Sequence, residues 1–459
     1  MRITEHSLTL EQADKPVLLH IGTGISSVPI VFNPPCLSSV IAKNMPFGTC
    51  YKALNFGMVA SLSIPNGGTD SPLGGELMYL RGIALLIVTY VAALAGIAPI
   101  TTYASSSIAP DFAAIDEYVA AEMRADRVPG VALAIVQNDR IVHMRGFGDD
   151  GTGRPITAQS AFLLGSMSKS FTAVATMQLV EQGKVELDAP VQRYLPWFRV
   201  ADVEASAYIT VRHLLNHTSG IPTKAPHAGA EPLTIEAHVR ALADVRLNHT
   251  PGTVHEYASP NYLVLETIIE QVTGQSYAEY VERNIFATLD MQHSFTSQEA
   301  AMRDTMVRGH RYWFGLSRPT VLDYEDDRMP TAALISSAED LGHFLVAQLN
   351  QGHYQNQTIL SATSMEAMHR PAIQSDGFAY AMGWRVSEIN GMPAIHHGGV
   401  VPHFRGKLVM LPQQGWGVVV LTNVSSVLPL PATSHRMADT IAASLTGAPL
   451  QARRLSRSI

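Results

Sequence analysis

Two β-hairpin patterns, one near each end of the main body of the chain, constrain its fold more than any other feature. Apolar stretches at residues 131–136 and 140–144 flank a polar turn, and those at 407–411 and 416–421 flank a second turn at 412–415. Short apolar runs separated by turn residues are typical of antiparallel β-hairpins. The two ends of this region therefore both supply strands.

Helical patterns fill most of the sequence between the two hairpins. They dominate about residues 171–349, for example at 263–272 and 277–286, and others lie outside the hairpins at 111–124 and 434–445. We predict an α+β fold in which an antiparallel β-sheet, formed from both ends of the region, is flanked by helices and carries a mostly helical inserted domain.

The composition excludes several classes of protein. The 459 residues are 46% hydrophobic and 15% charged, which is enough apolar material for a large core. The net charge is −7 and no Lys/Arg-rich run occurs, so we expect no nucleic-acid partner. Cys36 and Cys50 are the only cysteines. The main body therefore has no disulfide framework, no cysteine-based zinc site and no cysteine nucleophile.

An apolar segment divides the main body from the N-terminal residues. Arg81 precedes an uncharged run at residues 82–103, and the small residues Ala104 and Ser105 follow it. A positive start, an apolar middle and a small-residue exit are typical of a secretory signal. We expect residues 78–105 to be a signal peptide or a single membrane anchor. A buried core helix is the alternative, which the length of the run and its lack of a polar face disfavour.

Residues 1–77 are rich in Gly, Pro and Ser and lack clear periodicity. We expect either an unstructured N-terminal extension or a protein whose true start is Met78. A cytoplasmic tail ahead of a signal anchor is a further alternative. The domain itself then covers residues 106–447, and 448–459 form a C-terminal tail. The protein is expected to be exported: secreted, periplasmic or anchored to the outer face of the cytoplasmic membrane.

Residues 163–175 place Ser166 and Lys169 three positions apart at the start of a predicted helix. Positions i and i+3 share a helix face, so the lysine amine can reach the serine hydroxyl. A serine hydroxyl is a weak nucleophile and needs such a base nearby. Taken alone, the S-x-x-K spacing indicates two residues on a solvated helix face more often than a catalytic pair, because serine and lysine are both common on such faces.

Six further segments accompany this motif in a fixed order. They are VPGVALAIV at 128–136, HLLNHTSGIP at 213–222, PGTVHEYASPNY at 251–262, NIFATLDMQHSF at 284–295, SSAEDL at 336–341 and HHGG at 396–399. With them the chain resembles the serine β-lactamase superfamily, in particular the group of class C β-lactamases, DD-peptidases, D-aminopeptidases and related esterases. The resemblance implies a β-lactamase/transpeptidase-like fold and a serine hydrolase without a cofactor.

The resemblance assigns four catalytic residues. Ser166 matches the acylated nucleophile and Lys169 matches the base that activates it. Tyr257 matches the tyrosine of the Y-x-N element, which relays a proton to the leaving group or from the deacylating water. His397 matches the first residue of the H-x-G element on the strand that forms one wall of the cleft.

Other positions are expected to bind the substrate. The resemblance implies that Gly399 lets the substrate backbone approach the strand, and that the N–H groups of Ser166 and Val400 form the oxyanion hole. Two positions depart from the family pattern. Ser259 replaces the asparagine of Y-x-N as a substrate-binding residue, and His403 replaces a glycine, which we interpret as a surface-loop histidine.

Because DD-peptidases and D-aminopeptidases of the resembled group often carry H-x-G, the resemblance implies peptides with D-residues or esters as substrates and not efficient β-lactam hydrolysis. The expected partner is a small-molecule or peptide substrate, such as a cell-wall peptide or a β-lactam, and the alternative is a non-catalytic penicillin-binding or sensor domain. His213, His217 and His227 have no acidic partner at ligand spacing. We therefore expect no metal site and interpret His217 as structural.

Overall fold

The computed structural model describes residues 17–23, 26–32, 110–223, 234–313, 316–320, 329–425 and 433–451. The chain divides into two units, Met1–Ser106 and Ser107–Ile459. In the first unit, strands β1 (Val17–Thr23) and β2 (Ser26–Phe32) form an antiparallel hairpin.

The segment expected to be an export signal or anchor, residues 78–105, lies outside the described residues. It therefore stays a prediction, as do the exported location and the boundaries that we place around it. Within the described residues, no helix is long and apolar enough to cross a membrane.

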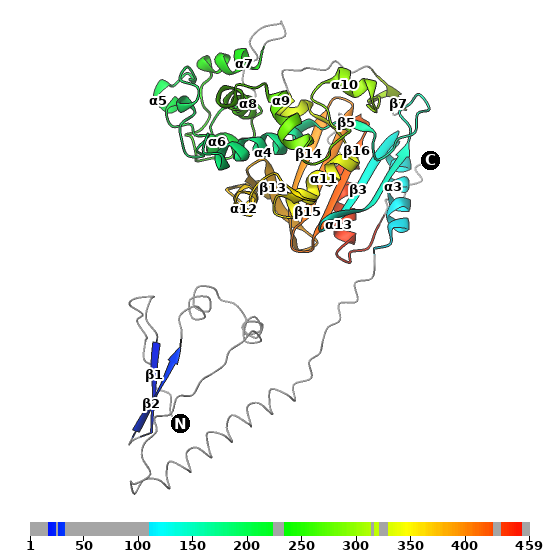
Figure 1. Ribbon diagram of the computed structural model, residues 1–459. Helices are drawn as coiled ribbons and strands as arrows, with labels where there is room; N and C mark the ends of the chain where they lie inside the picture. The colour runs from blue at the N-terminus through cyan, green and yellow to red at the C-terminus, as the bar shows by residue number, and fades with distance from the viewer. Residues whose placement is uncertain are drawn as a thin grey trace. The chain divides into compact units, whose positions relative to one another are not determined.

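An eight-stranded sheet forms the centre of the second unit (Figure 1), and all of its neighbouring strands are antiparallel. In spatial order its strands are β11 (Ile373–Ser375), β12 (Phe378–Ala381), β13 (Trp384–Ile389), β14 (Met392–Val401), β15 (Phe404–Leu411), β16 (Trp416–Thr422), β3 (Gly130–Gln137) and β4 (Arg140–Gly148). Strand β16 pairs directly with β3, so the two ends of the domain meet in one sheet. This confirms the predicted α+β class.

Both faces of the sheet are covered, which explains why β3 and β16 are buried at nearly every position and consist mostly of apolar residues. On β3, Val131, Leu133 and Ile135 pack into the cluster on one face, and the residues between them pack into the cluster on the other. Helices α3 (Phe112–Asp126) and α13 (Thr433–Ser444) cover the first face, and α11 (Ala338–Leu349) covers the second (Figure 1).

Most of the remaining elements lie between β4 and β11 in the chain. The helices and helical turns are η3 (Gly165–Met167), α4 (Ser168–Glu181), η4 (Val191–Arg193), α5 (Val203–Ser206), α6 (Val211–Leu215), α7 (Ile235–Ala241), η5 (Leu242–Asp244), α8 (Pro260–Thr273), α9 (Tyr277–Val281), η6 (Glu282–Phe286), α10 (Gln298–Arg303), η8 (Met329–Ala333) and α12 (Ala362–His369). The short strands are β5 (Ala161–Leu163), β6 (His310–Trp313), β7 (Leu316–Pro319), β8 (Ile335–Ser337), β9 (His353–Tyr354) and β10 (Gln357–Thr358), with β17 (Val424–Ser425) after the main sheet.

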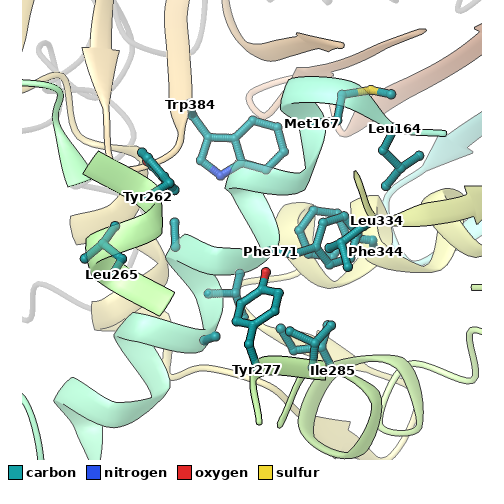
Figure 2. Close-up of a cluster of buried hydrophobic side chains, with 14 of the residues drawn as sticks. Leu164, Met167, Phe171, Tyr262, Leu265, Tyr277, Ile285, Leu334, Phe344 and Trp384 are labelled. Carbon is teal, nitrogen blue, oxygen red and sulfur yellow. The ribbon is translucent and has the colours of Figure 1, made fainter. Parts of the chain in front are cut away.

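Helix α4 is a central helix of the domain and is buried along most of its length. All of its residues from Ser168 to Leu179 are buried, as expected of a helix without a solvent face. Phe171 stacks on Phe344 of α11 with ring centroids 4.1 Å apart, and Figure 2 shows both rings in the cluster around α4. This packing holds the start of α4, and the motif on it, in a fixed place.

Candidate active site

Ser166 and Lys169 lie where strand β5 passes into helix α4. Gly165 has a φ of +57°, a left-handed conformation that glycine adopts without strain and that turns the chain sharply into η3. Ser166 is half-buried, whereas Lys169 is completely buried. The Lys169 Nζ lies 3.4 Å from the Ser166 Oγ, within hydrogen-bond reach. The structure therefore brings the two residues of the S-x-x-K motif together.

The other neighbours of the Lys169 amine are oxygen atoms and aromatic rings. Its Nζ donates to the main-chain carbonyl of Thr331 at 2.8 Å and lies 3.5 Å from the Ser259 Oγ. The same atom lies 5.0 Å from the ring centre of Tyr257 and 5.7 Å from that of Tyr262. Among the described residues no carboxylate pairs with this amine. Its side-chain hydrogen-bond partners among the described residues are thus the hydroxyls of Ser166 and Ser259.

Tyr257 lies on the segment before helix α8, beside Lys169 and His397. Its ring centre is 6.3 Å from that of His397 on β14. The Tyr257 Oη is buried and has no hydrogen-bond partner in the described part of the chain. A buried hydroxyl without a partner is costly in a native protein and is common where a ligand completes the site.

His397 is completely buried on strand β14, with protein partners for both ring nitrogens. Its Nδ1 donates to the Gly398 carbonyl at 2.9 Å, and the Tyr380 hydroxyl donates to its Nε2 at 3.3 Å. Burial, followed by the nearby charge of Arg385, holds the pKa of His397 well below its usual range. His397 is therefore a neutral side chain within the wall of the site, and a catalytic role for it stays a prediction.

The far end of β14 presses against the turn that carries Ser166. Strand β13 pairs with β14 only as far as His396. Beyond that residue, the edge of β14 that does not pair with β15 faces the Ser166 turn. A Cβ on Gly399 would lie 1.8 Å from the Leu164 carbonyl oxygen, and one on Gly165 would lie 2.6 Å from the Val400 nitrogen. Glycine at 165 and 399 is what allows the two backbones to touch.

A family model described as Beta-lactamase matches residues 115–440. The chain belongs to the beta-lactamase family. The match runs from α3 to α13 and includes every residue of the site. Membership in the beta-lactamase family confirms the resemblance stated from the sequence and supports a serine-hydrolase function in general terms.

Relatives and a solved structure agree with this family assignment. Protein flp from Staphylococcus aureus (strain N315) is 28% identical over 320 residues, and the match spans 68% of this chain but only 63% of flp. Penicillin-binding protein 4 from Amycolatopsis lactamdurans is 31% identical over 312 residues, 64% of this chain and 81% of that protein. The octameric penicillin-binding protein homologue from Pyrococcus abyssi matches with a TM-score of 0.65 and 27% identity, covering 74% and 78% of the two chains.

The structure accounts for one departure from the family pattern and locates the other. His403 is half-buried in the turn between β14 and β15 with a φ of +73°, a conformation that favours the glycine expected there and that histidine tolerates better than most residues. Ser259 directs no hydrogen bond into the N-terminus of α8, and its Oγ lies beside Lys169. Position 259 thus lies beside Lys169, and a substrate-binding role for Ser259 stays a prediction.

The sequence did not reveal two residues of this site. Thr331 contributes a main-chain carbonyl, which every residue type carries, so no pattern could have identified it. Arg385 lies on β13, with its guanidinium carbon 5.7 Å from the Tyr257 ring centre and 4.6 Å from that of Phe378. It is half-buried, its Nε is buried without a hydrogen-bond partner, and no described carboxylate pairs with it.

The three histidines considered as metal ligands have different surroundings. His213 belongs to the N-terminal capping box of α6, His217 is buried behind Tyr257, and His227 lies outside the described residues. In the part of the chain that the structure describes, no three His, Cys, Asp or Glu side chains come together as metal ligands.

Proposed function

We propose that this member of the beta-lactamase family hydrolyses amide or ester bonds through an acyl-Ser166 intermediate. Its preferred substrates carry a carboxylate on the leaving-group side of the scissile bond, as peptides with D-residues and β-lactams do. The observation that carries the preference is Arg385, a half-buried cation beside Tyr257 without a described anionic partner.

The reaction follows from the positions of the side chains. The Ser166 Oγ attacks the carbonyl carbon while the Lys169 amine, 3.4 Å away, takes the hydroxyl proton. The oxyanion forms against the backbone N–H groups of Ser166 and Val400, and the close approach of Gly165 to the Val400 nitrogen supports this role. Donor groups placed in advance stabilise this charge without reorganising.

The hydroxyl of Tyr257, which has no hydrogen-bond partner among the described residues, supplies the next proton. It protonates the departing nitrogen or oxygen as the bond to the carbonyl carbon breaks, and it recovers a proton from Lys169. A water molecule then attacks the acyl-Ser166 ester and gives one proton to the Tyr257–Lys169 pair. The acid leaves and Ser166 regains its hydroxyl proton.

Arg385 is suited to hold a carboxylate on the leaving group because it lies next to the proton donor for that group. A cation taken from water without an anion is destabilising, and a substrate carboxylate would restore the pairing. The planar guanidinium also fits a carboxylate with two parallel hydrogen bonds.

Arg385→Gln should selectively impair substrates with a charged leaving group. Two aryl esters with the same acyl group form a matched pair. The leaving group is 3-hydroxybenzoate in one ester and methyl 3-hydroxybenzoate in the other. Loss of a charge-assisted hydrogen bond should lower kcat/KM for the charged ester by about 10- to 100-fold, or about 1.5 to 3 kcal/mol. We expect a change of less than about three-fold for the neutral ester, which lacks the contact.

Arg370→Gln is a matched control, because Arg370 pairs with Glu366 on the exposed side of α12. It should leave both esters unaffected. Equal losses on both esters in Arg385→Gln would refute the carboxylate site while leaving the acyl-Ser166 mechanism intact.

Ser259→Asn should shift the preference between substrate classes. The longer amide can reach both Lys169 and an amide in the acyl part of the substrate, whereas the Ser259 Oγ lies only beside the amine. One neutral hydrogen bond contributes about 0.5 to 1.5 kcal/mol, so activity on a β-lactam or peptide relative to p-nitrophenyl acetate should rise by about two- to ten-fold. Ser259→Ala should lower all activities mildly. A ratio that is unchanged, or that moves toward the ester, would show that position 259 does not face the substrate.

A further inference from the structure

His217 makes three contacts with the segment that carries Tyr257. Its carbonyl accepts the N–H of Glu256 at 2.9 Å, and its Nδ1 accepts the N–H of Ala258 at 3.2 Å. Its ring centre lies 4.3 Å from that of Tyr257, the shortest ring-to-ring distance of either residue within the described part of the chain. One residue thus holds the backbone on both sides of Tyr257 and packs on its phenol.

The hydrogen bonds fix the tautomer of His217. The hydroxyl of Ser219 donates to the Asn261 Oδ1 at 2.6 Å, which turns the Asn261 amide nitrogen toward the His217 Nδ1 at 3.1 Å. With Ala258 and Asn261 both donating to it, Nδ1 carries the lone pair and the proton is on Nε2. Burial is the main cause that holds the pKa of His217 well below its usual range, so the ring stays neutral.

The backbone of His217 is also adapted to this place. Its φ is +55°, a left-handed conformation that histidine, asparagine and aspartate adopt more readily than other side chains. A residue here must therefore tolerate this backbone and present an acceptor to Ala258. Asparagine meets both requirements without supplying a ring.

The Tyr257 hydroxyl has no described hydrogen-bond partner, so ring contacts and backbone position determine where it lies. His217 packs on the Tyr257 ring at 4.3 Å, and the Lys169 amine lies 5.0 Å from the centre of that ring. Displacing a reacting group by about 1 Å can lower a rate about 100-fold, so a proton donor held in this way depends on its neighbours.

We propose that His217 is a positioning residue: as a neutral imidazole it holds the Tyr257 hydroxyl in line with Lys169 and the leaving group. The proposal rests on the acyl-Ser166 mechanism and adds to it a residue that does not touch the substrate. It differs from the structural role expected from the sequence, because His217 then acts on kcat through Tyr257 and not on folding alone.

A double-mutant cycle between His217 and Tyr257 tests this role. His217→Asn keeps the acceptor and removes the ring, so kcat should fall by about 10- to 100-fold while KM changes less than about three-fold. In a Tyr257→Phe background the same substitution should lower kcat by less than about two-fold, because the hydroxyl that it positions is already gone. His217→Gln, a second acceptor-bearing variant, should lower kcat in the same way and also lower Tm further, because glutamine adopts the left-handed backbone less readily than asparagine.

His369→Asn is the matched control. His369 is a half-buried histidine that is also neutral, because burial of its ring lowers its pKa to about 4. It hydrogen-bonds to Gln348 and packs on the edge of Trp384, and neither of these is a residue of the site. Its loss should lower Tm and leave kcat within about two-fold, which measures the effect of losing a packed, neutral imidazole alone.

Three results would overturn the proposal: a His217→Asn loss of equal size in both backgrounds, an increase in KM that accounts for the loss, or failure of both His217 variants to give a cooperative melt. A different result would refute the role of Tyr257 in the mechanism itself: an unchanged kcat in Tyr257→Phe with His217 intact.

Discussion

Alanine at Ser166 or at Lys169 is expected to lower kcat by about 1,000-fold or more, and the double variant should be little worse than either single one. In the proposed mechanism Ser166 forms the acyl bond, and Lys169, whose Nζ lies 3.4 Å from the hydroxyl, is the base. When two groups act as one unit, losing either one removes the function of both. The fold-losses in kcat of the two single variants therefore do not multiply in the double variant.

The measurement is kcat on an activated ester for the wild type, both single variants and the double variant. Lys184→Ala is the control, because Lys184 is exposed just beyond the C-terminal end of α4. It should keep full activity. A Ser166→Ala protein with wild-type turnover would exclude the mechanism. A double variant whose fold-loss in kcat equals the product of the two single losses would mean that the two side chains act independently.

Gly399→Ala should give the second large loss, about 100-fold or more in kcat/KM. The added Cβ would lie 1.8 Å from the Leu164 carbonyl oxygen, so the β14 edge and the Ser166 turn must move apart. That movement would displace the N–H groups of Ser166 and Val400, which we propose as the oxyanion hole. Overpacking of this kind also lowers the free energy of unfolding, by about 1 to 3 kcal/mol.

Gly417→Ala separates the local effect from a general effect on the sheet. Gly417 lies on β16, where a Cβ would come no closer than 3.2 Å, to the flexible end of Leu345. We expect this variant to keep kcat/KM within about three-fold, with a small shift in Tm on thermal melting. Gly399→Ala at wild-type activity would show that β14 and the Ser166 turn do not form a shared anion site.

The central sheet was predictable because each hairpin carries its own turn and apolar runs. Strands β3, β4, β15 and β16 all lie where those patterns place them. The expected helix at 277–286 is instead α9 followed by the π-helical turn η6, because side-chain periodicity does not distinguish these two hydrogen-bond patterns. Strands β12 and β13 were not predicted, because β12 has only four residues and the apolar residues of β13 are interrupted by Arg385, Ser387 and Glu388.

The site was predictable where a motif fixes residue types. Ser166, Lys169, Tyr257 and Ser259 come together as the resemblance implied. Arg385 has no such signal, because its importance depends on contacts with a ring 128 positions earlier in the chain and on the absence of a described anion beside it.

The acyl-Ser166 intermediate is the central claim, and acid-quenched mass spectrometry tests it most directly. The protein is mixed with an activated ester or a β-lactam, quenched within one turnover, digested and analysed for the added acyl mass. We predict that the mass lies on the peptide containing Ser166 and is absent from Ser166→Ala treated in the same way. An acyl group on any other residue, or hydrolysis of the reagent by Ser166→Ala at the wild-type rate, would contradict the account.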